Sequence, residues 1–447
     1  MRRGSSRGCE ALYLGLDLGT SGCRAVAIDA GGAIRATCAS RYRHAGVATD
    51  PAAWWEALTR LLAALAARVG GRRVRALAVA GTSGTLLLCD RRGTPLAPAI
   101  LYDDARARDR SGEIAARCGE AGGALGAGSS LASLLWLRAH GLDRGARHAL
   151  HPADWIAGKL TGRFGHSDYN NCLKLGYDAV GGAWPPWLDE LGVDRSLLPE
   201  VHSPGETLGV VRAGLAERLG LARGARVVAG TTDGVASFLA AGACEPGDAV
   251  SSLGTTLVLK LLSDRPVYCA RHGVYSHRLG TRWLAGGASN SGGGAIAQHF
   301  SAAELRRLAP RLDPDRPTGL DYYPLPGTGE RFPVSDPALA PRFEPRPRER
   351  AVFLQAILEG IARIEARGYA LLAELGAPPL RRVYTTGGGA RNRPWARIRA
   401  RVLGVPLARA RSVRAAYGAA RIAAGEVFAD ADAHRRSVSC RSHRIAA

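Results

Sequence analysis

Two short turns of this chain combine glycine with hydroxyl side chains, a pairing suited to binding phosphate. Residues 17–24 read DLGTSGCR and residues 252–256 read SLGTT. Glycine lets the backbone N–H groups of such a turn approach an anion closely, and Ser and Thr add hydroxyl donors. Both turns lie between apolar runs expected to be strands, so neither is the GKS/T loop that opens a helix in Walker-type sites. The pair predicts a phosphate site, although residues 17–24 alone also fit an ordinary hairpin with a capping aspartate.

Asp233 is the acid best placed for catalysis. It lies in the glycine-bounded segment GTTDG at 230–234, directly before an apolar run expected to be a helix. A carboxylate within reach of a hydroxyl group can take its proton as the oxygen attacks a phosphorus atom. The same position also suits a helix N-cap, where Asp is among the preferred residues. The local sequence by itself favours the cap, so the catalytic role depends on the other motifs of the chain.

The elements that must position these residues form a first series near the N-terminus. Strands are expected at 12–17 and 24–29, with a third after the Gly31-Gly32 turn, and a further strand at 74–80 runs into GTSG. Between them, Asp50 is expected to cap a helix that has Pro51 at its first position. The apolar residues that recur at helical spacing as its buried face are Trp54, Leu58, Leu61, Leu62 and Leu65.

A second series begins near residue 225 and repeats part of the first. Strands are expected at 226–229, 249–253 and 257–262, and a helix at 235–241. The hairpin turns Leu18-Gly19-Thr20-Ser21 and Leu253-Gly254-Thr255-Thr256 form a faint internal repeat. Alternating strands and helices indicate an α/β protein. We expect two related lobes with a nucleotide in the cleft between them, divided at about residue 245.

Two segments do not follow this alternation. Residues 310–347 are dense in Pro, Asp and Arg with little periodicity, and are expected to be an ordered surface excursion. Residues 351–374 resume as a long helix, and residues 431–447 are expected to be a basic tail.

The net charge of the chain suggests nucleic-acid binding, but the kind and distribution of its basic residues argue against it. The net charge is +21, but only Lys159, Lys174 and Lys260 are lysines, against 57 arginines. This composition is typical of a GC-rich coding sequence, and most of the arginines are scattered rather than clustered as a phosphate-binding face requires. We therefore expect no nucleic-acid partner.

Composition also predicts the compartment. No apolar run reaches the length of about 18 residues that spans a bilayer, and nine cysteines without a CxxC pair suggest neither zinc nor a disulfide framework. His151, His272 and His299 fit no metal spacing. We expect a soluble, cytoplasmic protein that does not bind membranes; the sequence does not predict its oligomeric state.

Five motifs, in this order, resemble those of the FGGY carbohydrate kinases, relatives of actin and the heat-shock ATPases. The resemblance implies an α/β fold of two actin-like (ribonuclease H-like) lobes: an N-terminal FGGY-like lobe at 1–244 for sugar and phosphate, and a C-terminal FGGY-like lobe at 245–430 for nucleotide. It implies a carbohydrate kinase that uses ATP and Mg²⁺. The motifs are LGLDLGTSGCRAVAID at 14–29, GTTDGVASFLAAGACEPGD at 230–248, SLGTT at 252–256, LEGIAR at 358–363 and TTGGGARNRPW at 385–395.

The resemblance also implies residue roles. Asp233 becomes the general base. Asp17 would repel phosphate, so it is expected to hold Mg²⁺ or its waters. The residues expected to bind the nucleotide are Gly19, Thr20, Ser21 and Arg24 in the first turn, Gly254, Thr255 and Thr256 in the second, Gly293 and Gly294 at a helix start, and Gly388, Gly389 and Asn392 in the adenosine loop.

The sugar pocket departs from the common patterns of the family. GTSG at 81–84 stands where xylulokinases usually have a His-Gly turn, and it also lacks the Arg-Glu pair of glycerol kinases. Together with NNCLKLGYD at 170–178, it resembles the compact D-ribulose kinase branch. Ser83, Gly84 and Asp104 would then bind sugar beside Asp233, although Asp104 also fits a structural ion pair with Arg106.

This resemblance leaves rival functions open. We expect a ketopentose kinase acting on the terminal hydroxyl, most of all of D-ribulose. One rival keeps the fold but phosphorylates D-xylulose, another ketose or a polyol. Another is a non-enzymatic actin-like ATP-binding scaffold, which would need no acid at residue 233.

Overall fold

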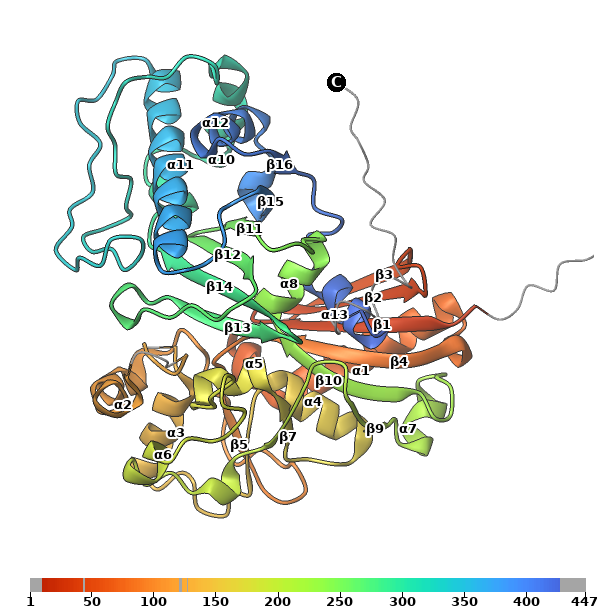
Figure 1. The fold of residues 1–447 in the computed structure, drawn as a ribbon. Helices are drawn as coiled ribbons and strands as arrows, with labels where there is room; N and C mark the ends of the chain where they lie inside the picture. The colour runs from red at the N-terminus through yellow and green to blue at the C-terminus, as the bar shows by residue number, and fades with distance from the viewer. Residues whose placement is uncertain (1–9, 43–44, 120–122, 127, 427–447) are drawn as a thin grey trace, which may run out of the picture.

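The computed structural model describes residues 10–42, 45–119, 123–126 and 128–426. It contains two six-stranded sheets, with strand orders β3-β2-β1-β4-β10-β9 and β13-β14-β12-β11-β15-β16 (Figure 1). The strands of the first sheet are β1 (Leu12–Gly19), β2 (Gly22–Asp29), β3 (Ile34–Arg41), β4 (Val74–Gly81), β9 (Thr207–Val210) and β10 (Arg226–Thr232). Those of the second are β11 (Asp248–Leu253), β12 (Leu257–Ser263), β13 (Tyr275–Leu279), β14 (Arg282–Ser289), β15 (Arg382–Thr386) and β16 (Leu407–Ala408).

The two sheets share one pattern. In the first, β1 and β2 form an antiparallel hairpin and β4 pairs with β1 in parallel. In the second, β11 and β12 form the hairpin and β15 is the parallel neighbour of β11. This confirms the predicted α/β fold with two actin-like lobes. The division at residue 245, with lobes at 1–244 and 245–430, stays a prediction, and the tail at 431–447 lies outside the described residues.

The predicted first helix is α1 (Pro51–Val69), and it is capped as expected. The Asp50 side chain accepts a hydrogen bond from the N–H of Ala52, and Pro51 occupies the first turn, where no N–H partner is needed. All five apolar residues assigned to its inner face are buried against the first sheet. The 3.6-residue period of apolar residues was sufficient to predict the buried face of α1, because one face of this helix packs on the core and the other faces solvent.

A subdomain is inserted between β4 and β10 and has its own apolar core. In Figure 1 it lies beneath β13, so it faces the second sheet. The elements of the insertion are β5 (Leu87–Cys89), α2 (Ser111–Cys118), α3 (Ser130–Ala139), β6 (His148–Leu150), α4 (Pro152–Thr161), β7 (His166–Asp168), α5 (Tyr169–Cys172), α6 (Trp187–Glu190), β8 (Glu200–His202) and, beyond β9, α7 (Ala213–Arg218). Of these, α4 and α7 pack in the core of the first sheet.

Helices α8 (Asp233–Ala241) and α13 (Ala415–Ala423) lie between the two sheets (Figure 1). Two glycines let α13 pack at close range. A Cβ atom on Gly15 of β1 would lie 1.9 Å from the carbonyl oxygen of Ala416, and one on Gly418 would lie 1.8 Å from that of Ala236. Gly418, near the C-terminal end of the described chain, thus lets α13 pack against α8 and fix the position of the helix that begins with Asp233.

The segment at 310–347 is more than the predicted surface excursion. It contains no regular strand, as expected, but Tyr322, Leu325 and Phe332 are almost fully buried. Tyr322 and Phe332 share a core with α11 (Arg350–Glu374), whose predicted extent is confirmed to within one residue. The remaining helices of this lobe are α9 (Gly293–Ala297), α10 (Ala302–Leu308) and α12 (Arg393–Leu403).

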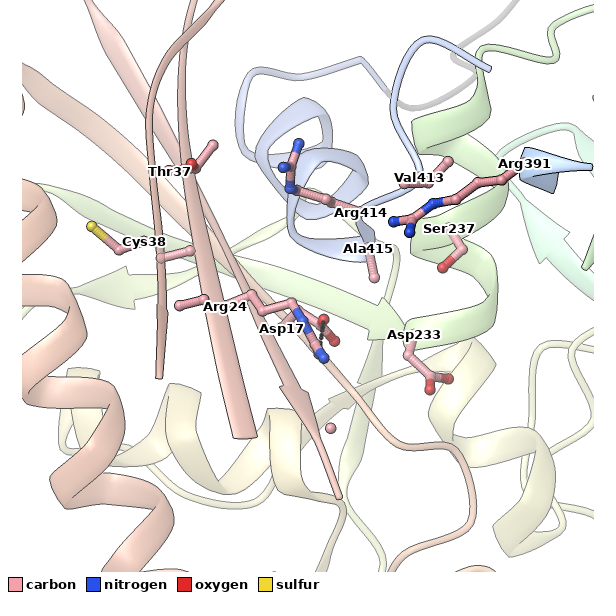
Figure 2. Close-up of a pocket in the computed structure, with 13 residues that line it drawn as sticks. Asp17, Arg24, Thr37, Cys38, Asp233, Ser237, Arg391, Val413, Arg414 and Ala415 are labelled. Carbon is pink, nitrogen blue, oxygen red and sulfur yellow. Dashed lines mark hydrogen bonds and ion pairs between the residues drawn. The ribbon is translucent and has the colours of Figure 1, made fainter. Parts of the chain in front are cut away.

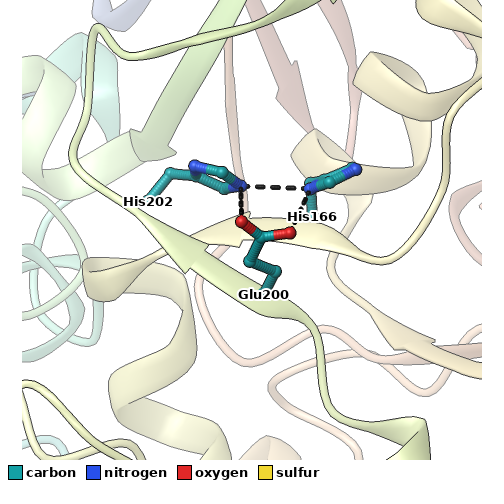
Figure 3. Close-up of side chains that lie close together, drawn as sticks. All are labelled: His166, Glu200 and His202. Atoms are coloured by element: carbon teal, nitrogen blue, oxygen red, sulfur yellow. Dashed lines mark hydrogen bonds and ion pairs between the residues drawn. The ribbon is translucent and has the colours of Figure 1, made fainter.

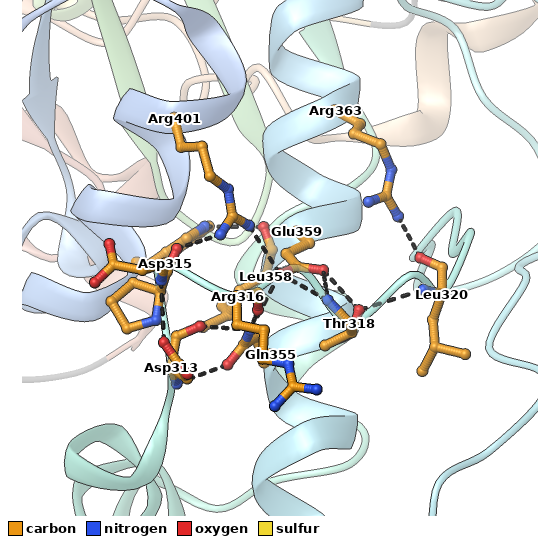
Figure 4. A network of polar contacts seen from close by, with 12 residues as sticks. Asp313, Asp315, Arg316, Thr318, Leu320, Gln355, Leu358, Glu359, Arg363 and Arg401 are labelled. Atoms are coloured by element: carbon orange, nitrogen blue, oxygen red, sulfur yellow. Dashed lines mark hydrogen bonds and ion pairs between the residues drawn. The ribbon is translucent and has the colours of Figure 1, made fainter.

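Polar contacts also fasten this segment to the helices behind it (Figure 4). Glu359 of α11 accepts hydrogen bonds from the N–H and hydroxyl of Thr318 and forms an ion pair with Arg401 of α12. Gln355 donates to the carbonyl oxygens of Asp313 and Arg316. Most of these polar contacts are made by backbone groups of the segment, which leave no periodic signal in its sequence.

A fully buried ion pair joins α11 and α12. The Arg399 guanidinium donates to both carboxylate oxygens of Glu365, at 2.6 and 2.7 Å, and to the Thr385 hydroxyl. Ser251 of β11 donates to the same carboxylate. Such a pair is costly to desolvate but more costly to break, because the remaining charge has no water around it.

None of the helices in the described part of the chain is long and apolar enough to cross a membrane.

We therefore predict that Arg399→Met lowers the free energy of unfolding by about 3–5 kcal/mol, since Glu365 would be left buried without its partner. Arg397→Met is the matched control on the same helix. Arg397 pairs with Asp315 at an exposed site, so its loss should cost no more than about 1 kcal/mol. Urea denaturation followed by circular dichroism measures both. Equal effects of the two substitutions would show that the buried pair does not support the lobe.

Candidate active site

The first hydroxyl-rich turn opens into a cavity of about 570 Å³ between the lobes (Figure 2). Asp17, Gly19 and Arg24 line it from β1 and β2, and Asp233 lines it from the first residue of α8. Arg24 forms an ion pair with Asp17 at 3.3 Å. The structure therefore brings the predicted metal ligand, the phosphate turn and the predicted base to one cavity.

Asp233 is not the N-cap of its helix. The cap is Thr232, whose hydroxyl accepts a hydrogen bond from the N–H of Val235. Strand β10 continues through Thr232, three residues further than predicted, so Asp233 begins the helix itself. One Asp233 oxygen accepts from the N–H of Gly234 at 2.7 Å. The N-cap role that the local sequence favoured for Asp233 is therefore filled by Thr232, and the Asp233 carboxylate is free to face the cavity.

The pKa values of both acids in this cavity are raised. Burial raises the pKa of Asp17 to about 6, and the Asp233 carboxylate adds to this shift while Arg24 opposes it. Burial also raises the pKa of Asp233. A divalent cation between two repelling carboxylates would relieve this cost, and carboxylate oxygens are the ligands that Mg²⁺ prefers. The residues present therefore fit the predicted metal.

A second cavity, of about 690 Å³, lies on the side of the second sheet. Its lining combines bare glycine backbone with the apolar side chains of Ile296, Leu358 and Trp395, and Arg391 borders both cavities. Such a surface suits a flat aromatic ring beside a charged chain. The predicted nucleotide residues that line it are Gly254, Thr255, Gly293, Gly294, Gly388, Gly389 and Asn392.

Other predicted nucleotide residues lie beside these cavities. Thr20 and Ser21 are exposed at the tip of the first hairpin, and Thr256 follows the second turn against Gly292. The Asn392 side-chain oxygen caps α12 by accepting from the N–H of Trp395, so its amide N–H₂ group is what remains for a ligand. Helix α9, predicted from its glycines, has five residues.

The predicted turn at 81–84 also adjoins Asp233, and it follows β4 where that strand pairs with the end of β1. The N–H of Ser83 faces the Asp233 carboxylate and helps to lower its pKa. The Ser83 hydroxyl is buried and has no hydrogen-bond partner among the described residues. Gly84 has φ +87°, and a Cβ there would lie 2.2 Å from the carbonyl oxygen of Gly128. An unpaired buried hydroxyl next to a carboxylate suits a hydroxyl-bearing ligand.

Two lysines for which the sequence motifs indicated no role also lie near Asp233. Lys174 and Lys260 both oppose the upward pKa shift of Asp233. Burial lowers the pKa of Lys260 to about 8 and also lowers that of Lys174. Lys260 contacts Nδ1 of His277 at 3.1 Å. No hydrogen bond or ion pair of the Lys174 ammonium is found among the described residues, and its Nζ atom lies beside Gly84.

A signal for these lysines was present in the composition. Of 60 basic residues other than histidine, only three are lysines, and two of those three adjoin Asp233. The third, Lys159, lies over the rings of Trp55 and Trp155. At residues 174 and 260 lysine supplies a compact ammonium charge in place of the planar guanidinium found almost everywhere else in the chain.

Asp104 has a structural role in the described contacts. Its carboxylate caps the short 3₁₀ helix Ala105–Arg110 and forms an ion pair with Arg106 at 2.7 Å. Both partners lie toward the surface. The ion pair that the sequence offered as the alternative is thus present, and a role for Asp104 in binding an acceptor stays a prediction.

Comparison with known proteins gives a consistent result. The model of the FGGY family of carbohydrate kinases, N-terminal domain, matches residues 12–240, and the C-terminal domain model matches residues 249–426. Xylulose kinase of Escherichia coli (strain K12) is 28% identical over 452 residues, which cover 92% of this chain and 89% of that protein.

Solved structures agree. A xylulose kinase from Rhodospirillum rubrum has a TM-score of 0.79 at 26% identity, covering 92% of this chain and 89% of that chain. Plasmodium falciparum glycerol kinase, solved with ADP, has a TM-score of 0.80 at 18% identity, covering 93% of this chain and 89% of that chain. The second likeness shows the fold alone.

The raised pKa of Asp17 leads to a stability prediction. At pH 7.5 the buried carboxylate is ionised against its environment, so Asp17→Asn should raise the free energy of unfolding by about 3 kcal/mol. The gain should shrink as the pH falls through 6 toward 4, because the native Asp17 then takes up a proton. Thermal unfolding at pH 7.5 and 5 measures it.

Asp248→Asn is the control for that experiment. Asp248 is equally buried but pairs with Arg382 and accepts from the N–H groups of residues 244 and 245. Its substitution should lower the unfolding temperature at pH 7.5. If Asp17→Asn lowers it as well, the Arg24 ion pair outweighs the cost of burying Asp17.

Proposed function

This chain belongs to the FGGY family of carbohydrate kinases, and on that premise we propose that it transfers the γ-phosphoryl group of ATP to the terminal hydroxyl of a ketopentose. One observation carries the proposal. Asp233 is a partly buried carboxylate that does not cap its helix, because Thr232 does, and it adjoins both the phosphate turn and two ammonium groups. A scaffold that only binds nucleotide has no need of a partly buried acid there, because burying it costs free energy.

We assign the nucleotide to the two adjoining cavities. Adenosine fits the apolar cavity beside Trp395, and the phosphates extend past Arg391 toward Gly19 and Arg24. Asp17 would hold Mg²⁺ directly or through water. When bound, the ion neutralises charge on the transferring phosphoryl group. The first turn supplies backbone N–H donors, and Arg24 supplies a fixed positive charge.

We assign the acceptor to the space beside Asp233 that the turn at 81–84 and Lys174 border. The unpaired Ser83 hydroxyl and the Lys174 ammonium are both available to sugar hydroxyls. Asp233 takes the proton of the attacking hydroxyl as the new oxygen–phosphorus bond forms. For this it must be ionised before transfer, and the nearby lysines favour its ionised form against the effect of burial.

Two ketopentoses compete as the preferred acceptor. The motifs at 81–90 and 170–178 resemble those of D-ribulose kinases, and Lys174 belongs to the second of them. The relatives named xylulose kinase favour D-xylulose. These sugars differ in the configuration at one carbon, which hydrogen bonds to Ser83 and Lys174 can read. We place D-ribulose first because Ser83 and Gly84 replace the His-Gly turn usual in xylulokinases.

The acceptor is tested by following ADP release over D-ribulose, D-xylulose, L-ribulose, glycerol and gluconate. We expect kcat/KM for D-ribulose to exceed that for the other four. A higher value for D-xylulose would transfer the assignment to that sugar and leave the kinase mechanism intact. No transfer to any ketose would contradict the proposal.

Asp233→Asn should lower kcat by about 10² to 10⁴-fold, because the amide cannot take the hydroxyl proton. Binding of MgATP, measured by calorimetry, should change little. Thr232→Ala is the matched control: it removes the cap and should cost about 1 kcal/mol of stability while kcat is retained. A folded Asn variant with parental kcat would place the base elsewhere.

Lys174→Met should raise the acceptor KM by about 10- to 100-fold, as expected for a lost hydrogen bond from a charged donor, and Ser83→Ala should raise it less. The KM for ATP should stay the same in both variants. Lys159→Met, which alters the lysine over Trp55 and Trp155, is the control and should leave both constants unchanged. A rise in the KM for ATP alone would show that the acceptor side is misassigned.

A further inference from the structure

Two histidines and a glutamate meet at a site remote from Asp17 in the sequence and made by the pairing of β7 with β8 (Figure 3). The strands are parallel, and His166 stands opposite Glu200 while His202 follows two residues later on the same strand. Nδ1 of His166 lies 3.0 Å from Nε2 of His202 and 3.4 Å from a Glu200 oxygen. Nε2 of His202 lies 3.7 Å from the other Glu200 oxygen.

These separations are close to the edges of a coordination tetrahedron. The two nitrogen–oxygen distances end on different Glu200 oxygens, so the carboxylate must turn to direct one oxygen at a metal held by both histidines. Zinc binds imidazole nitrogen and carboxylate oxygen at about 2.0–2.2 Å, so two such ligands in a tetrahedral site lie about 3.3–3.5 Å apart. The three measured separations fall on both sides of that value. Two imidazoles and one carboxylate are also the donor set that a divalent transition metal takes.

A fourth residue, Glu206, fixes the tautomer of His202. Nδ1 of His202 lies 2.8 Å from a Glu206 oxygen, which can only accept when ionised, so this nitrogen carries the proton. Nε2 of His202 therefore presents a lone pair toward His166 and Glu200. A carboxylate behind a ligating histidine is the usual arrangement that fixes its tautomer and orientation.

We propose that Nδ1 of His166, Nε2 of His202 and a carboxylate oxygen of Glu200 form a binding site for one Zn²⁺ ion, with the fourth position open to water. Glu206 acts as the positioning residue of His202. The site was not predicted from the sequence, because its histidines are 36 residues apart and lie in no recognised spacing. The ligand is a divalent transition cation, distinct in donor set from the Mg²⁺ expected at Asp17.

Bound metal would fasten β7 to β8. Strand β7 runs directly into α5, where Asn170 donates to the Thr231 hydroxyl at 3.1 Å and to the carbonyl oxygen of Arg278. Thr231 is two residues before Asp233. The clamp would thus stabilise the segment on which β10 rests without contacting nucleotide or acceptor.

The experiment uses the full chain, freed of metal with a chelator, and titrates it with Zn²⁺ and with Co²⁺ as a spectroscopic probe. We expect one equivalent of Zn²⁺ by calorimetry and a zinc-dependent rise in unfolding temperature. Co²⁺ should give the intense visible absorption of a four-coordinate site, with no thiolate charge-transfer band. Magnesium should not displace either ion.

Variants locate the ion. His202→Ala should abolish the visible Co²⁺ band and the thermal shift, and Glu206→Gln should weaken Zn²⁺ binding by about 10- to 100-fold. His140→Ala is the control, because His140 stacks on Trp136 in another part of the subdomain. A thiolate band, binding that His202→Ala retains, or no binding by the parent protein would each overturn the site and leave only hydrogen bonds among the three residues.

Discussion

The structure depends on keeping one carboxylate charged in a place where burial favours its neutral form. Asp233 is partly buried, which raises its pKa, and Asp17 adds a second negative charge to the same cavity. Lys174, Lys260 and the N–H groups of Ser83 and Gly234 offset these effects. They come from different parts of the chain, so the charge is stable only when the inserted subdomain, β12 and α8 are all in place. The groups that keep Asp233 ionised are therefore brought together only when the chain is folded.

That requirement explains the close packing around α8. The helix is fixed by α13, which returns from the C-terminal end of the chain and lies against β1, where Gly15 admits it. A displacement of α8 would move Asp233 relative to both the phosphate turn and the lysines. Glycine at residues 15 and 418 is therefore a steric condition of the site, although neither residue contacts a ligand-binding cavity.

What the sequence could predict was local. Hairpins, α1 with its Asp50 cap and the extent of α11 follow from turn chemistry and periodicity within short windows, and these were confirmed. The burial of residues 310–347 and the cluster at His166 and His202 arise from contacts across the fold that leave no periodic trace. Asp233 was predictable in part: its place in the sequence was local information, and its role was not. Its position before a helix was visible, but only the structure shows that Thr232 performs the capping.

The choice of lysine over arginine beside Asp233 follows from the same constraint. A guanidinium offers five donors in a planar fork and pairs with a carboxylate through both oxygens. Such a pair would occupy the oxygens that a base needs for its substrate proton. An ammonium is a compact charge that favours ionisation of Asp233 without covering it, and Gly84 and Gly128 leave room for the Lys174 side chain and little more. In a chain with 57 arginines, lysine at residues 174 and 260 preserves the charge while leaving the carboxylate open to an acceptor.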